Sequence, residues 1–412
     1  MSYVARFVFT LLPLLLLTAC AGLVDATKSA SKSLEGDAVE MLSFSSEDES
    51  RPPKELEDIS NEVVLAKLWQ EKLSAGQGDR FLKLEMVSTS EQLFIADHKG
   101  RVVALDRQTG EKDWAVETNL PISGGIGLGD GYLFFGTTDA EAVALSFADG
   151  KRAWISQVSS EVLSVPRYEN NIVIFRSIDG AIAALDALDG KELWSFVRDV
   201  PALSLRGTSS PVLKSGGVIA GYANGQLVVL RLLDGLQIWQ TSVAIPRGRG
   251  ALSRMVDVDS DPLAGDEYIY AATFNGGMAA VEIRTGKIAW RQSELSSFKQ
   301  MASNWSSIFV VDIDDHIWSA DQETGGINWQ MDKLEHRRLS PAAIVDDVLL
   351  TADYEGYLHM ISVSDGHLMG RIKVSNAPVV AAPLVDGGFI FVQDINGQVT
   401  ALQFASEEAS ED

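Results

Sequence analysis

The 412-residue chain contains a single cysteine, Cys20, and only five histidines. One cysteine can form neither a disulfide bond within the chain nor a cysteine-based zinc site. None of the histidines follows the HExxH or HxH spacing that is typical of metal ligands. The sequence therefore predicts neither a disulfide-stabilised fold nor a histidine-based metal centre.

Basic residues are also scarce. The chain has 34 Lys and Arg against 57 Asp and Glu, which gives a net charge of −23. Non-specific binding of nucleic acid needs a basic surface, and docking on anionic lipid needs a polybasic patch. We therefore expect no nucleic-acid partner, and no membrane contact through surface charge.

Common catalytic motifs are missing as well. The chain has no G-x-S-x-G elbow, no phosphate-binding P-loop and no dinucleotide-binding fingerprint. Asp257, Asp259, Asp261 and Asp266 lie close together, but they lack the order and the final glutamate of a calcium-binding EF-hand loop. We expect no resident cofactor or metal and no enzymatic activity.

Only one long apolar run is present, FVFTLLPLLLL after Arg6, and it is too short to span a bilayer. It is typical of a signal peptide, which we assign to residues 1–19. Leu17-Thr18-Ala19-Cys20 resembles the bacterial lipoprotein signal, and this resemblance implies that Cys20 is acylated and becomes the first residue. The alternative is a free cysteine after an ordinary signal peptide. In similar lipoproteins Asp after the cysteine favours the inner membrane, so Ala21 implies the periplasmic face of the outer membrane.

Composition divides the remaining chain. Residues 20–53 are rich in Ser, Glu and Asp and predict a flexible acidic tether. Residues 54–404 form the folded part, and residues 405–412 form an acidic tail without structure.

The folded part contains eight repeats. Each complete repeat has a first position, usually Gly, and a Trp fourteen positions later, as in GRVVALDRQTGEKDW. Between them lies an Asp or Thr that is followed directly by Gly. Gly370 replaces the seventh Trp, and the eighth repeat stops before its turn. The repeats begin at Gly100, Ala140, Gly180, Gly225, Gly276, Asp315, Gly356 and Gly397.

Each repeat predicts four short strands. An apolar strand leads through the glycine turn into a second strand, which we expect to end at the Trp, and another hairpin lies upstream, as in Pro211–Tyr222. Four strands in roughly 40 residues leave no room for a crossover helix. This period predicts an all-β, eight-bladed β-propeller of four-stranded blades.

The eighth repeat lacks its outer strand, which would leave an exposed edge. The segment Leu65–Leu73 contains Trp69, which stands 45 residues before Trp114 and so continues the series. We expect this N-terminal strand to pair with the C-terminal blade and close the ring, so that the tether leaves beside the closing blade.

The pattern A-x-D-x-x-T-G-x-x-x-W resembles the tryptophan-docking motif of quinoprotein propellers, in which the Trp packs between blades. A buried indole covers roughly 150–250 Å² and its N–H needs an acceptor, so a structural role is expected. Seven of the nine tryptophans are in register, and Trp305 and Trp318 are not. The blade-docking residues are Trp69, Trp114, Trp154, Trp194, Trp239, Trp290 and Trp329.

The same resemblance raises an alternative, a periplasmic dehydrogenase that uses pyrroloquinoline quinone and calcium. Many such enzymes have long inserts and an adjacent cysteine pair. This chain has neither the pair nor most of the inserts.

Two connections between repeats are long, 198–211 and 246–267, and we expect them on one face of adjacent blades. Apolar residues with flanking charge on a rigid scaffold favour a protein-binding site. The other interpretation is that the leucines of the first connection, Leu203 and Leu205, pack locally and that the charged residues of both connections are solvated.

Taken together, the lipoprotein signal, the acidic linker and the eight repeats resemble the BamB-type propeller lipoproteins of the outer-membrane β-barrel assembly machinery. The closest local matches are LSLRG at Leu203–Gly207 and DVDSDP at Asp257–Pro262. The resemblance implies that these connections bind the POTRA domains of the central barrel-assembly protein. It assigns this role to Leu203, Leu205, Arg206, Arg254, Asp257 and Asp259.

We therefore expect a non-enzymatic scaffold that aids the delivery of unfolded barrel precursors. Its expected partners are the barrel-assembly protein, the other lipoproteins of that complex and the precursors themselves. Besides the dehydrogenase, a receptor lipoprotein that binds a ligand in its central channel stays open as an alternative.

Overall fold

The computed structural model describes residues 51–78, 80, 82–198, 209–246 and 255–405. Over these ranges the regular elements are β-strands. No helix in the described ranges has the length and apolar character that a membrane crossing requires. The expected lipidation site, Cys20, lies outside the described residues.

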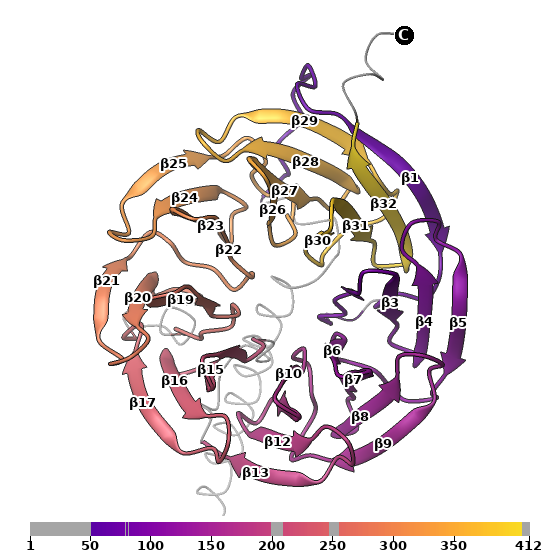
Figure 1. Ribbon diagram of the computed structural model, residues 1–412. Coiled ribbons are helices and arrows are strands. Elements are labelled where there is room, and N and C mark those ends of the chain that lie inside the picture. Colours follow the sequence, from indigo (N-terminus) through magenta and orange to yellow (C-terminus); the bar gives the residue numbers. More distant parts are fainter. Residues whose placement is uncertain (1–50, 79, 81, 199–208, 247–254, 406–412) are drawn as a thin grey trace, which may run out of the picture. The chain divides into compact units, whose positions relative to one another are not determined.

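The strands form eight four-stranded antiparallel sheets arranged in a ring (Figure 1). We number the sheets blade 1 to blade 8 in chain order. The predicted eight-bladed propeller is thereby confirmed. From the inner to the outer strand, blade 1 consists of β2 (Val87–Ser88), β3 (Gln92–Ala96), β4 (Arg101–Asp106) and β5 (Lys112–Glu117), and blade 2 of β6 (Gly127–Gly129), β7 (Tyr132–Gly136), β8 (Glu141–Ser146) and β9 (Arg152–Gln157). In the same order, blade 3 consists of β10 (Arg167–Glu169), β11 (Ile172–Arg176), β12 (Ile182–Asp186) and β13 (Glu192–Phe196), and blade 4 of β14 (Val212–Lys214), β15 (Gly217–Gly221), β16 (Gln226–Arg231) and β17 (Gln237–Ser242).

Blades 5 to 8 follow the same order, except that the outer strand of blade 8 comes from the N-terminal side of the chain. Blade 5 consists of β18 (Leu263–Ala264), β19 (Tyr268–Ala272), β20 (Met278–Glu282) and β21 (Ile288–Gln292), and blade 6 of β22 (Ala302–Ser303), β23 (Ser307–Val311), β24 (Ile317–Asp321) and β25 (Ile327–Met331). Blade 7 consists of β26 (Ala343–Val345), β27 (Val348–Ala352), β28 (Tyr357–Ser362) and β29 (Leu368–Lys373), and blade 8 of β30 (Leu384–Asp386), β31 (Phe389–Gln393), β32 (Gln398–Phe404) and β1 (Leu65–Lys72).

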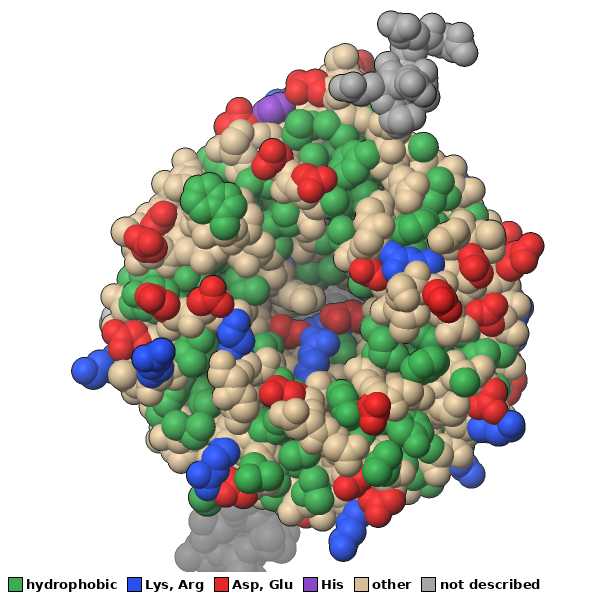
Figure 2. All heavy atoms as spheres, viewed as in Figure 1, with side chains coloured by type: hydrophobic (Ala, Val, Ile, Leu, Met, Phe, Trp, Pro, Cys, Tyr) green, Lys and Arg blue, Asp and Glu red, His purple; other side chains and the backbone are tan. Residues whose placement is uncertain are grey.

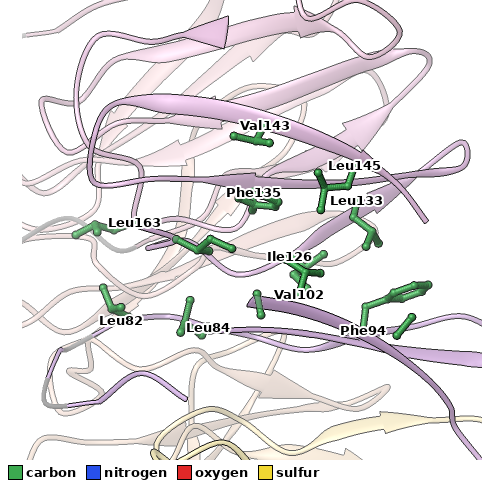
Figure 3. Packing of buried hydrophobic residues seen from close by; sticks show 13 residues of the cluster. Leu82, Leu84, Phe94, Val102, Ile126, Leu133, Phe135, Val143, Leu145 and Leu163 are labelled. Atoms are coloured by element: carbon green, nitrogen blue, oxygen red, sulfur yellow. The ribbon is translucent and has the colours of Figure 1, made fainter. Parts of the chain in front are cut away.

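The hydrophobic core is divided among the junctions between neighbouring blades. Strand β4 shows why, because its successive side chains point to opposite faces of the sheet. Val102 and Ala104 face the core between blades 1 and 2, shown in Figure 3, whereas Val103 and Leu105 face the core between blades 8 and 1. The run VVAL is therefore apolar throughout because both of its faces are buried.

The prediction that each outer strand ends at its tryptophan is wrong. In blade 1, β5 continues to Glu117, three residues beyond Trp114. Ala104 pairs with Trp114 while Leu105 pairs with Lys112, so Asp113 is an extra residue in a β-bulge. The bulge lets the strand carry the indole toward the next blade and still pair along its whole length.

The predicted ring closure is confirmed. Strand β1 pairs antiparallel with β32, from Leu65 opposite Phe404 to Lys72 opposite Gln398. Blade 8 thus combines three strands from one end of the folded part with one strand from the other end. The edge that the eighth repeat would have left open is covered.

The sequence predicts that the tether leaves the ring beside the closing blade, blade 8, but the first described residues lie against blade 6. Arg51 donates to the Asp314 carboxylate of blade 6 at 2.9 Å, and the Lys54 amide donates to the Glu335 carbonyl at 3.0 Å. The amides of Glu62 and Val63 then donate to the Met369 carbonyl on β29. The chain therefore joins the ring at blade 6 and crosses blade 7 before it forms β1.

Seven tryptophans dock on the next blade in the predicted way. The indole N–H of each donates to a backbone carbonyl in the following blade's turn, at 2.8 to 3.1 Å. The turn glycine at each contact has a positive φ and lies under the ring. The pairs are Trp69 with Gly110, Trp114 with Gly150, Trp154 with Gly190, Trp194 with Gly235, Trp239 with Gly286, Trp290 with Gly325 and Trp329 with Gly366.

The eighth junction explains why Gly370 replaces a tryptophan. Strand β32 of blade 8 does not lead through a glycine turn into its outer strand, so blade 8 offers no such turn for docking. The N-terminal segment fills this position instead, since a Cβ on Gly370 would lie 2.6 Å from the Val63 carbonyl oxygen. Backbone hydrogen bonds from the segment to β29 thus take the place of one indole.

Candidate functional site

The two long connections lie on adjacent blades, as predicted. The first joins the outer strand β13 of blade 3 to the inner strand β14 of blade 4, and the second joins β17 of blade 4 to β18 of blade 5. Both therefore run from the outside of the ring to its centre. Four of the predicted partner-binding residues, namely Leu203, Leu205, Arg206 and Arg254, lie outside the described residues.

The returning end of the second connection is buried. Asp257 is 3% exposed and Asp259 is 8% exposed. The Phe274 amide donates to the Asp257 carbonyl at 3.0 Å, and the Val258 amide donates to the Tyr222 carbonyl at 3.2 Å. This burial disfavours a role as exposed surface charge for these two carboxylates, whereas their role in shaping the loop stays a prediction.

The returning end of the first connection meets the second directly. Ser209 and Ser210 are both buried, and the Ser210 amide donates to Asp261 Oδ1 at 2.6 Å. The Ser209 hydroxyl donates to the Ser260 carbonyl at 3.2 Å. The two connections are therefore hydrogen-bonded to each other where they rejoin the ring.

Asp261, which is buried, is also the centre of an ionic cluster whose other members are partly exposed. Lys83 Nζ lies 2.6 Å from Asp261 Oδ1 and 3.4 Å from Glu85 Oε1, and Arg167 Nη2 lies 3.4 Å from Asp261 Oδ2. Burial alone would lower the pKa of Lys83, but the carboxylates of Asp261 and Glu85 raise it above its usual value. This cluster was not predicted from the sequence, because Lys83 lies before the first repeat and no sequence motif surrounds it.

Two arginines flank the start and the return of the first connection. The guanidinium carbons of Arg176 and Arg198 lie 5.3 and 5.2 Å from the centre of the Tyr222 ring. Burial raises the pKa of Tyr222, and the two positive charges oppose that shift. Arg176 Nη1 also donates to the Ser209 carbonyl at 2.8 Å, which fixes the returning chain to blade 3.

Exposed apolar side chains gather on the same two blades. Seven of the twelve large exposed hydrophobic residues in the described ranges belong to blades 3 and 4 or to the chain that follows their outer strands. On the face shown in Figure 2, green apolar surface is spread over the whole ring, these two blades included. We call these seven residues the apolar edge: Leu188, Leu193, Val197, Leu233, Leu236, Ile238 and Ile245.

Two residues of the apolar edge, Leu193 and Ile238, lie on strands whose outer side is unpaired, and the other five lie in the turns before these strands or in the chain after them. Strands β13 and β17 each have one partner strand, so their outward N–H and C=O groups have no neighbouring strand in the described ring. An edge of this kind with apolar side chains is suited to binding another extended chain or a protein surface.

The described residues offer little for catalysis by a bound metal. They contain no group of three or more His, Cys, Asp or Glu side chains that could hold an ion. Asp261, which sequence proximity had placed beside Asp257 and Asp259, pairs with Lys83 and Arg167 instead.

Comparison with known proteins agrees with the fold. The sequence model of the family described as outer membrane protein assembly factor BamB matches residues 98–331 and 321–408. The outer membrane protein assembly factor BamB of Pseudomonas aeruginosa is 45% identical over 350 residues, which cover 85% of this chain and 92% of that protein.

Solved structures share the propeller, among them a BamB and a quinohemoprotein alcohol dehydrogenase. The crystal structure of BamB from Moraxella catarrhalis superposes with a TM-score of 0.76 at 24% identity, covering 83% of this chain and 100% of the other. The quinohemoprotein alcohol dehydrogenase of Comamonas testosteroni gives 0.68 at 13% identity, covering 85% and 78%. These two similarities show the fold alone, whereas the sequence matches show that the chain belongs to the family of the outer membrane protein assembly factor BamB.

Proposed function

We propose that this protein is a non-enzymatic scaffold for the assembly of outer-membrane β-barrel proteins. It is held at the periplasmic face of the outer membrane by a lipidated Cys20, and it binds the POTRA domains of the central barrel-assembly protein. The other lipoproteins of the assembly complex and the unfolded precursors are its further partners. Support comes from the family and from the binding features on blades 3 to 5.

One observation carries the proposal. The two long connections rejoin the ring side by side, and the apolar edge lies on the blades from which they start. A protein interface typically has an apolar centre and a polar rim. Leu203 and Leu205 would supply apolar anchors, Arg206 and Arg254 would supply charge, and Asp257 and Asp259 would shape the second connection.

The test uses the full-length protein and the purified POTRA domains. Leu205→Asp and Arg206→Glu should each abolish co-purification, because a hot-spot residue often contributes 2 kcal/mol or more, about a thirtyfold change in affinity. Ile313→Asp on blade 6 and Arg152→Glu on β9 are the matched controls, since both residues are exposed and lie away from the connections. Full binding by the Leu205 and Arg206 variants would refute the proposed site.

Client binding follows a separate route in this proposal. An unfolded barrel precursor is an extended chain with alternating apolar residues, and it can add to the free edge of β13 or β17 by β-augmentation. Crosslinkers placed at Leu193 and Ile238 should capture precursor, whereas a crosslinker at Asn328 on β25 should not. A map without precursor contacts on the outer strands would exclude this route.

A further inference from the structure

The ion pair between Lys83 and Asp261 crosses the centre of the ring. Lys83 lies before β2 of blade 1, and Asp261 lies two residues before β18 of blade 5. Blades 1 and 5 are opposite each other in a ring of eight blades. Figure 2 shows acidic and basic side chains in the hollow at the centre.

The cluster around Asp261 connects the inner ends of blades 1 to 5. Lys83 forms an isolated backbone bridge with Gly124, which precedes β6 of blade 2. Arg167 belongs to β10 of blade 3, and Ser210 precedes β14 of blade 4. The Asp261 carboxylate thus receives donors from blade 1, blade 3 and blade 4 while it sits at the start of blade 5.

Both long connections return to the ring at this cluster. The first returns through Ser210, whose amide donates to Asp261 and whose hydroxyl accepts from the Val165 amide at 3.0 Å. The second returns through Asp261 itself. A shift of one returning end therefore disturbs the other, because the two share one acceptor.

The low exposure of Asp261 constrains where its carboxylate can lie. The Asp261 side chain is 4% exposed and the Lys83 side chain is 18% exposed. A buried carboxylate without a counter-charge is strongly disfavoured, so Asp261 stays where Lys83, the nearer cation, and Arg167 can both reach it. Lys83 Nζ also donates to the Ser210 hydroxyl at 3.4 Å, so one side chain from the segment before blade 1 contacts both returning ends.

We propose that Lys83 and Asp261 are positioning residues that hold the returning ends of the two connections in one fixed relation, so that both connections meet the partner as a single surface. This inference rests on the proposed function, since it assumes that the connections bind the POTRA domains. It adds a residue, Lys83, that belongs to neither connection and reaches the returning ends of both from the segment before blade 1.

The test compares Lys83→Met with Lys83→Arg in the full-length protein. Lys83→Met should weaken binding of purified POTRA domains by about fivefold or more, within the usual range for coupling between sites. It should also speed hydrogen exchange at the Ser210 amide and over residues 255–262. Lys83→Arg keeps the positive charge and should restore both the affinity and the protection.

A matched ion pair on blade 6 controls for lost stability. Lys299 Nζ lies 2.5 Å from Asp315 Oδ1, and the two side chains are 10% and 5% exposed. Asp315 also accepts the Arg338 and Leu339 amides, as Asp261 accepts the Ser210 amide. Lys299→Met should therefore lower the melting temperature about as much as Lys83→Met, with unchanged affinity for the POTRA domains.

If Lys83→Met does not fold, Asp261→Asn replaces it, because the amide oxygen still accepts from Ser210 while the charge is lost. Faster exchange with weaker binding supports the inference. Faster exchange with unchanged binding overturns it, and so does unchanged exchange. If Leu205→Asp binds fully while Lys83→Met shows both effects, the role of Leu205 is refuted and the positioning role stands.

Discussion

The indole nitrogen of Trp69 donates a hydrogen bond to the carbonyl oxygen of Arg107 at 3.1 Å and so joins the last blade of the ring to the first. Trp69 stands on β1, the one strand that the N-terminal side of the chain contributes to blade 8. The same indole covers Gly110 in the first turn. Strand β1 and its Trp69 therefore contribute to ring closure together with the ion pair between Arg107 of blade 1 and Asp386 of blade 8.

Replacing Trp69 by alanine should destabilise the ring. Removing a buried tryptophan typically costs about 3–5 kcal/mol. Trp305 is 91% exposed, so Trp305→Ala should change the free energy of unfolding by less than about 0.5 kcal/mol. Urea unfolding of both variants measures the difference, and equal stabilities would contradict the closing role of Trp69. Deletion of Leu65–Leu73 should go further and abolish cooperative unfolding.

The docking turns can be tested at a glycine. Gly110 has a φ of 74°, and a Cβ there would lie 2.7 Å from Trp69 Cδ2. Gly216 also has a φ of 74°, but a Cβ there would have no neighbour within 4 Å. Gly216→Ala should cost only the backbone strain, about 1–2 kcal/mol. Gly110→Ala should cost about 1–3 kcal/mol more, from the added clash. Equal losses in urea unfolding would show that the indole does not constrain the turn.

Stability should fall in mild acid because of His359. Its Nε2 lies 3.0 Å from Asp353 Oδ2, and its Nδ1 has no hydrogen-bond partner in the described ring. Burial lowers the pKa of His359, and the hydrogen bond with Asp353 only partly opposes this. The folded state thus keeps the imidazole neutral while the unfolded state binds a proton below the usual pKa of 6.5.

The sign of this effect is therefore fixed. The contribution of His359 is complete above pH 6.5 and is lost as the pH falls below it, with a limiting slope of about 1.4 kcal/mol per pH unit. His359→Gln should flatten the profile of unfolding free energy between about pH 5 and 6.5. The exposed His367 has its pKa raised by Asp365 and Glu62, so it acts in the opposite direction, and His367→Gln should not flatten this profile. Identical profiles for wild type and His359→Gln would contradict the assignment.

The sequence predicted the parts of the structure that repeat. The interval between tryptophans, the glycine turns and the missing outer strand follow from one pattern, so the ring, its closure and the docking of seven indoles were all predictable. Even the exception at Gly370 could be located, although its cause lies in the packing of Val63.

Contacts outside the repeat could not be predicted. The pairing of Lys83 with Asp261 joins residues from opposite blades, and no spacing relates them. The path of the chain from Arg51 to Val63 depends on single hydrogen bonds to blades 6 and 7. The burial of Asp257 and Asp259 is equally invisible in a stretch that reads as an acidic surface loop.

The dehydrogenase alternative predicts a bound quinone and calcium. Protein purified from membranes should show neither quinone absorbance nor stoichiometric calcium by elemental analysis. The expectation rests on the single cysteine at position 20, which leaves no adjacent cysteine pair, and on the proposed scaffold function. One quinone per chain would restore the enzyme as a candidate.

The proposed scaffold function is best tested by a pull-down of the full-length protein from detergent-solubilised envelope. We expect the central barrel-assembly protein and its accompanying lipoproteins to be recovered in stoichiometric amounts. Leu205→Asp should lose them while its thermal unfolding is unchanged. Recovery of the folded protein without the barrel-assembly protein would refute the proposed function.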